Sequence, residues 1–142
     1  MKITSKWIRT KFERRRGDDP YSRLWEELPL GSRTLLLRGV VLETQEVPVC
    51  AITALPNPVV ITTRHLVWRV GESPHSLRLN ELASCQPPSL PMSKLDMSKV
   101  VVKTHSGKEH LIETAPGKTL FVLWNVLLQF ARPRASSHGM EN

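Results

Sequence analysis

Five histidines and two cysteines are the residues of this 142-residue chain whose side chains most often ligate metals or carry out catalysis. No HExxH or Cys-x-x-Cys pattern brings two such ligands together, and no histidine has a carboxylate at metal-site spacing. The histidines are His65, His75, His105, His110 and His138. We therefore interpret each of them as a surface or core imidazole, and we predict no catalytic residue, no metal and no cofactor.

The remaining reactive side chains also lack the neighbours that catalysis needs. Cys50 and Cys85 stand outside any motif that would activate a thiolate, and we interpret them as buried free thiols, although only a structure can exclude a bridge between them. Ser106-Gly107 is typical of a hairpin turn, and the chain has no GxxxxGK[ST] phosphate loop. The PxxP match at residues 88–91 is interpreted as a stiff connector. These observations predict a protein that is not an enzyme and has no small-molecule substrate.

The positive charge of the chain is concentrated at one end. The formal net charge is +7, and residues 1–16 hold seven cations against Glu13, whereas residues 17–31 hold one arginine and four acids. The first segment is thus a basic arm with a net charge of +6, followed by a segment of −3. A charged arm attracts anionic partners through a long-range, salt-sensitive field, which nucleic acid, acidic lipid and acidic protein would all feel.

The basic arm is also amphipathic. Ile3, Trp7, Ile8 and Phe12 fall near one side of a helix, and the cations surround the other side. Two interpretations remain open at this point: the arm is a helix that lies at a membrane interface, or its apolar side packs on its own domain. The predicted contact residues for an anionic partner or a membrane are Lys2, Lys6, Trp7, Ile8, Arg9, Lys11, Phe12, Arg14, Arg15 and Arg16.

Two further helices are predicted. Asp19 as a cap and Pro20 in the first turn favour a short helix over 21–28, which ends at Pro29. The apolar stretch 118–132 predicts the helix around which the fold is arranged, with Pro133 ending it. In that helix we expect Trp124 to be buried near Trp68 or the 100–102 strand. The side chains expected to face water are Thr119, Asn125, Gln129 and Arg132.

The middle of the chain is rich in branched residues and predicts strands. The predicted strands cover residues 34–44, 47–55, 59–63, 66–70 and 76–82, and a hairpin follows over 99–114. A three-residue hairpin loop places Val100, Val102, His110 and Ile112 on one face. Residues 86–98 form a loop rich in Pro and Ser. The predicted fold class is α+β: a seven-stranded, strongly bent antiparallel sheet, or partly open barrel, capped by a C-terminal helix and preceded by an N-terminal helical extension.

The stretch ITTRHLVWRVGESPHSLRLNELASC, residues 61–85, resembles the bacterial pleckstrin-homology-like (PH-like) and GRAM-like pattern. In this pattern a strand that ends in Thr is followed by a basic residue, a Leu-containing strand and a turn. A short strand then runs into a segment similar to ELASC, residues 81–85 of this chain. The resemblance extends from about Thr34 to Arg132 and implies a binding or scaffolding module. Residues 1–31 have no counterpart in it, and the TQEVP turn at 44–48 lacks the Lys/Arg cluster of phosphoinositide-binding members, which argues against recognition of an inositol phosphate.

These features predict how the chain is divided and what it binds. We expect a basic amphipathic arm and short helix over 1–31, a PH-like domain over 32–133 and a disordered tail over 134–142. Because no apolar run approaches the ~20 residues that span a bilayer and no signal peptide is recognisable, a cytoplasmic protein is expected, with or without peripheral attachment to a membrane. The leading hypothesis is protein–protein interaction. Attachment of the arm to anionic lipid is the alternative, and nucleic-acid binding is a third option that rests on charge alone.

Overall fold

The computed structural model describes residues 3–88 and 97–141, with side chains described as far as Ala131. The described chain is an α+β fold with three α-helices and eight strands. The helices are α1 (Ser5–Arg16), α2 (Leu30–Leu36) and α3 (Lys118–Glu141), with 3-10 turns at Trp25–Glu27 and Leu79–Glu81. The strands are β1 (Ser22–Leu24), β2 (Pro48–Ile52), β3 (Val59–Thr62), β4 (His65–Val70), β5 (Ser73–Arg78), β6 (Leu82–Gln86), β7 (Lys99–Thr104) and β8 (Glu109–Glu113).

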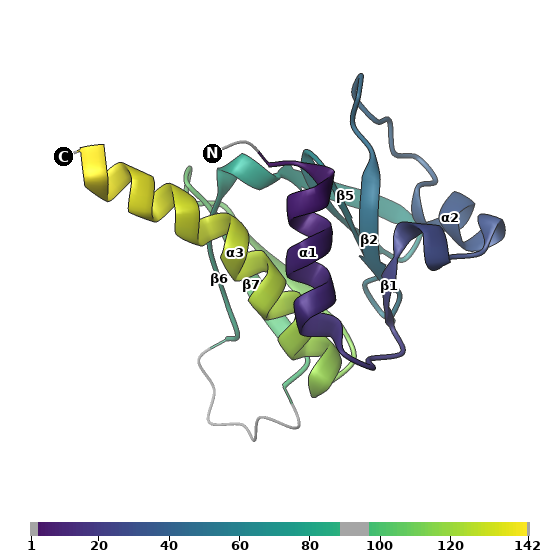
Figure 1. The fold of residues 1–142 in the computed structure, drawn as a ribbon. Coiled ribbons are helices and arrows are strands. Elements are labelled where there is room, and N and C mark those ends of the chain that lie inside the picture. Colours follow the sequence, from purple (N-terminus) through teal and green to yellow (C-terminus); the bar gives the residue numbers. More distant parts are fainter. Residues whose placement is uncertain (1–2, 89–96, 142) are drawn as a thin grey trace.

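The strands form two antiparallel sheets. The five-stranded sheet has the order β1-β2-β3-β4-β5, and the three-stranded sheet has the order β6-β7-β8. The chain passes from the first sheet to the second through the 3-10 turn between β5 and β6. Helices α1 and α3 lie side by side over the strands, while α2 lies at the far side of the five-stranded sheet (Figure 1).

Both faces of the five-stranded sheet are covered. Its inner face packs with α1, α3 and the three-stranded sheet in one apolar cluster that includes Cys50, Ile61 and Trp68. Its outer face, represented by Ala51 and Val67, packs against Leu36 of α2 and its neighbours in a second cluster. This double coverage explains why β2, β3 and β4 are apolar almost throughout instead of alternating with polar residues.

The predicted β4 strand and the hairpin are confirmed. β4 pairs with β3 and β5, and Val100 pairs with Ile112 while Val102 pairs with His110. The amide of Thr104 donates to the carbonyl of Lys108, so residues 105–107 form the predicted three-residue loop. Val100, Val102 and Ile112 are buried, as expected for one face of a half-buried hairpin.

Two predictions in the first third of the chain are wrong. The predicted helix over 21–28 is the short strand β1 followed by a 3-10 turn, because Ser22–Leu24 pairs with Ile52–Cys50 of β2. The predicted strand over 34–44 is the end of α2 followed by a connection to β2. The leucines there are as suited to a helix as to a strand, and the helix lets Leu36 cover the outer face of the sheet. The predicted strand over 76–82 is also divided, because β5 ends at Arg78, the 3-10 turn Leu79–Glu81 follows, and β6 begins at Leu82. The strand count in the described residues is therefore eight and not seven.

The C-terminal helix is confirmed, with three corrections. It continues past Pro133 to Glu141, so the prediction that proline ends it is wrong; a helix survives the loss of one backbone donor at a cost of ~3 kcal/mol. Thr119 does not face water: it is buried and donates to Asp19 at 2.7 Å. Trp124 is half-buried and not buried; it packs against the main core, and its indole donates to the carbonyl of Cys85 on β6 at 2.9 Å.

Some expectations are not addressed by this architecture. The strand β1 lies within residues 1–31, the segment assigned to the arm and short helix, and it pairs with β2 of the sheet. The exact domain boundaries and the tail over 134–142 stay predictions. Most of the predicted Pro- and Ser-rich loop falls on residues 89–96, outside the described residues. None of the helices in the described part of the chain is long and apolar enough to cross a membrane.

Replacing Leu127 by alanine tests the role of α3 in the core. Leu127 is fully buried, so the Leu127→Ala variant loses apolar contacts and leaves a cavity, which should lower the free energy of unfolding by ~2–5 kcal/mol. Chemical denaturation followed by circular dichroism measures this loss. The same change at half-buried Leu128 is the control and should cost less; equal losses would contradict the packing of α3 described above.

Candidate functional site

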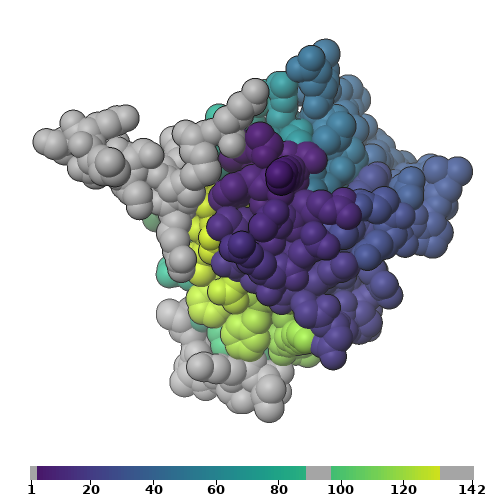
Figure 2. Space-filling model, viewed as in Figure 1, coloured from purple at the N-terminus to yellow at the C-terminus, as the bar shows by residue number. Residues whose placement is uncertain are grey.

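The apolar side of α1 is packed on the chain's own domain. Ile8 and Phe12 are fully buried in the main core, and the ring of Trp7 lies edge-on to Phe130 of α3, with 5.5 Å between ring centroids. In the surface view, α1 and the first half of α3 form one continuous face (Figure 2). Of the two interpretations of the arm, the structure shows the second: the apolar side of α1 packs on its own domain. Membrane insertion by Ile8 and Phe12 would require α1 to leave the core.

The cations of the arm are partly neutralised by the acidic segment that follows it. Arg9 pairs with Glu26 and, at 3.6 Å, with Glu13. Arg16 makes a bidentate pair with Glu27 and also donates to the carbonyl of Ser22 at 3.4 Å. The net charges of +6 and −3 in the sequence therefore belong to segments that contact each other.

The other predicted contact residues of the arm are less tightly held. Lys6 and Arg14 are exposed, the ammonium of Lys11 lies 5.6 Å from the centre of the Trp7 ring, and Arg15 donates to the carbonyl of Lys11 at 3.1 Å. Lys2 is outside the described residues. The structure thus collects the predicted arm residues on one helix. It divides them into a buried apolar side, two cations paired with acids, and an exposed cationic side.

A groove that the sequence analysis missed lies between α2 and the turn that joins β4 to β5. It encloses about 330 Å³ and is lined mainly by apolar surface. Its lining residues are Ser32, Leu35, Leu36, Arg38, Thr53, Pro58, Arg69, Gly71 and Glu72. The sequence could not show this groove, because the segment that forms its α2 wall was predicted to be a strand.

Arg69 is the buried cation at this groove. Its guanidinium donates to the backbone carbonyls of Leu36, Arg38 and Glu72 at 3.3, 2.8 and 2.7 Å. These bonds tie the C-terminal end of α2 to the β4–β5 turn. Within the described residues, no carboxylate forms an ion pair with Arg69, so its charge is balanced only by carbonyl dipoles.

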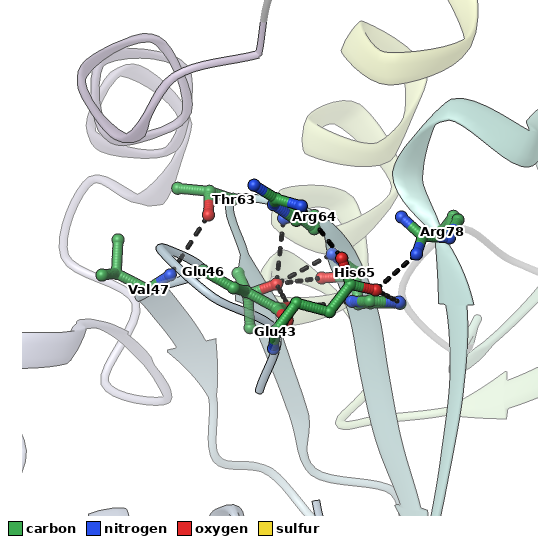
Figure 3. A network of polar contacts seen from close by, with 8 residues as sticks. Glu43, Glu46, Val47, Thr63, Arg64, His65 and Arg78 are labelled. Carbon is green, nitrogen blue, oxygen red and sulfur yellow. Dashed lines mark hydrogen bonds and ion pairs between the residues drawn. The ribbon is translucent and has the colours of Figure 1, made fainter. Parts of the chain in front are cut away.

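A second polar cluster lies at the opposite end of β4, where β3 and β4 meet the segment before β2 (Figure 3). His65 contacts Glu46 through Nδ1 at 2.8 Å and Glu43 through Nε2 at 3.7 Å. Arg64 and Arg78 both pair with the carboxylate of Glu43. The prediction that no histidine has a carboxylate partner is therefore wrong for His65, because Glu43 and Glu46 are brought to it from another part of the chain.

Glu46 is the buried member of this cluster. Burial alone would raise its pKa, but hydrogen bonds from the Thr62 hydroxyl, the Glu43 amide and the His65 ring outweigh that effect and hold the pKa of Glu46 below its usual value. These bonds fasten the connection between α2 and β2 to the sheet. The donor atoms of Glu43, Glu46 and His65 lie within 4.8 Å of one another, so this trio is the set of described residues that could hold a metal ion.

The two cysteines have the environment of structural thiols. Cys50 and Cys85 are both free and buried, so no bridge joins them. Burial raises the pKa of Cys85 to about 12 and raises the pKa of Cys50 as well, which disfavours the thiolate that nucleophilic chemistry requires.

Comparison with known proteins shows a solved structure with a similar fold. No family model matches this sequence, and no curated protein matches it. A solved structure, that of a DUF1696 family protein with a pleckstrin-homology domain from Shewanella loihica PV-4, is similar to this chain with a TM-score of 0.51 and 14% sequence identity. The match covers 78% of this chain and 97% of that one. The chain therefore has a PH-like fold, as its sequence pattern suggested; at this identity the likeness extends to the fold alone.

The Arg16–Glu27 pair should give the protein a measurable pH dependence. The bond from Arg16 lowers the pKa of Glu27 from 4.5 to about 2, so the pair stabilises the fold fully above pH 4.5, and that stabilisation is lost as the pH falls towards 2. Because the pair is partly exposed, we expect Glu27→Gln to cost about 0–1 kcal/mol at neutral pH. The difference in melting temperature from wild type should shrink below pH 4.5. Glu81→Gln, at an exposed acid, is the control, and a difference for Glu27→Gln that does not change with pH would contradict the pairing.

Zinc titration tests the prediction that the chain holds no metal. Arg64 and Arg78 already place two positive charges against the carboxylate of Glu43, so a divalent cation bound by Glu43, Glu46 and His65 would have to displace them. We expect Zn²⁺ to leave the melting temperature of the untagged wild-type protein unchanged. The melting temperature of the His65→Gln variant should also be the same with and without Zn²⁺. A rise with zinc in wild type that His65→Gln abolishes would show a metal site instead.

Proposed function

We propose that this chain is a non-enzymatic binding module that takes a segment of another protein into the groove beside α2. The observation that carries the proposal is the apolar lining of the groove. Leu35 lines it and is 57% exposed, next to the buried Leu36. A large apolar side chain exposed in a concavity is typical of a protein-binding surface.

The size and support of the groove suit this role. A volume of about 330 Å³ is at the lower end of the ~300–1,000 Å³ range of ligand pockets, which suits one or two large side chains better than a large ligand. Its walls are fixed before binding, because Arg69 joins the end of α2 to the β4–β5 turn and Leu36 anchors α2 to the sheet. A partner therefore need not supply the free energy of ordering the groove.

The scaffold behind the groove is, in this proposal, one bent and partly open barrel. Asn57 supports the idea: its side chain accepts from the amide of Glu113 on β8 at 2.8 Å and donates to the carbonyl of Arg69 on β4 at 2.9 Å. These bonds link the two sheets at the end nearest the groove. The exposed cations of α1, Lys6 and Arg14, are left as an accessory contact for an acidic surface of the partner.

The proposal predicts that a single charge in the groove abolishes partner capture. Leu35→Asp places a carboxylate on an exposed position, so the fold should persist while the apolar surface is lost. Proteins captured from lysate by wild type should be retained by Leu111→Asp, a matched control at a 52% exposed leucine on β8, and lost by Leu35→Asp. Quantitative mass spectrometry measures the three sets, and melting curves confirm that each bait is folded. If no captured protein depends on Leu35, the proposed docking site is refuted.

A further inference from the structure

The groove contains donors that the fold does not use. A guanidinium has five N–H donors. In Arg69 three of them donate to the carbonyls of Leu36, Arg38 and Glu72, which leaves two without a partner in the described part of the chain. Arg69 lines the open space of the groove, and a hydrogen bond between a guanidinium and a carboxylate is stronger than one between neutral groups, so the unused donors favour an incoming acceptor.

The charges around Arg69 favour the same kind of group. Arg38 also lines the groove, is exposed, and forms no ion pair with any described carboxylate. Glu72 is the single acid of the lining, and its backbone carbonyl, not its carboxylate, is what Arg69 contacts. Two cations against one acid, in otherwise apolar surroundings, form a site in which a carboxylate is attracted to the arginines while a large apolar side chain covers Leu35 and Leu36.

We infer that the α2 groove recognises a segment of a partner protein in which a large apolar residue stands next to an Asp, a Glu or a free C-terminal carboxylate. The inference rests on the proposed function and specifies its ligand. The carboxylate accepts from the two unused donors of Arg69 and from Arg38, and the apolar side chain fills the space against α2. Arginine suits this task because its planar fork can bind both oxygens of a carboxylate.

Selection of random peptides on the immobilised full-length protein tests this inference. The baits are wild type, Arg38→Glu, the matched charge reversal Lys108→Glu in the exposed hairpin turn, and Leu35→Asp. Arg69 is left intact because it holds the end of α2. Peptides selected on wild type should be enriched in an acidic residue beside a large apolar one. Their affinity, measured by fluorescence polarisation, should fall about tenfold or more on Arg38→Glu, stay unchanged on Lys108→Glu, and be lost on Leu35→Asp.

The outcomes separate this inference from the proposed function. Suppose that the selected peptides lose binding on Leu35→Asp and yet show no acidic enrichment, or bind Arg38→Glu as tightly as wild type. Either result would overturn the inference and leave the groove as a docking site. Peptides that are insensitive to Leu35→Asp, or no selected peptide at all, would overturn both. Self-association of wild type in sedimentation, abolished by Leu35→Asp, would assign the groove to a second copy of the chain and would also overturn the inference.

Discussion

The burial of both faces of the five-stranded sheet is the constraint on which the other features depend. Its central strands are apolar on either side, so neither face can be left to water. The inner face is closed by α3, α1 and the three-stranded sheet, and the outer face is closed by α2. A short helix cannot cover a whole sheet face, and the edge of its coverage is the groove. The arm is docked for the same reason, because Ile8 and Phe12 complete the inner core.

The electrostatics of the chain follow from that docking. Once α1 is fixed on the core, its cations lie beside the acids of the next segment, and the pairs Arg9–Glu26 and Arg16–Glu27 form between partly exposed side chains. Lys118 similarly pairs with Asp18, and Thr119 bonds to Asp19, so the start of α3 is joined to the turn after α1. The strong positive field expected from the arm alone is therefore reduced to its exposed side.

What the sequence predicted correctly was decided by local patterns, and what it missed was decided by distant contacts. The 99–114 hairpin has a turn signal and a clear alternation, so even its register was predictable. The leucine run at 35–37 suits either a helix or a strand, and only the outer face of the sheet selects the helix. His65 was interpreted as isolated because Glu46, its carboxylate partner, is 19 residues away along the chain. The groove was missed for the same reason, since its lining comes from α2, from Thr53 and Pro58 around the β2–β3 connection, and from the β4–β5 turn.

The position of the groove bears on what a shared fold can say about function. The similar solved structure has a fold like that of this chain at 14% identity, and a shared fold leaves the surface residues undetermined. The groove depends on α2 and on Arg69, whose bonds hold the middle of the connection between β1 and β2, while the bond between Glu46 and His65 holds its C-terminal end to the sheet. In the proposed function, recognition therefore rests on the side chains of that connection, which a shared fold does not determine.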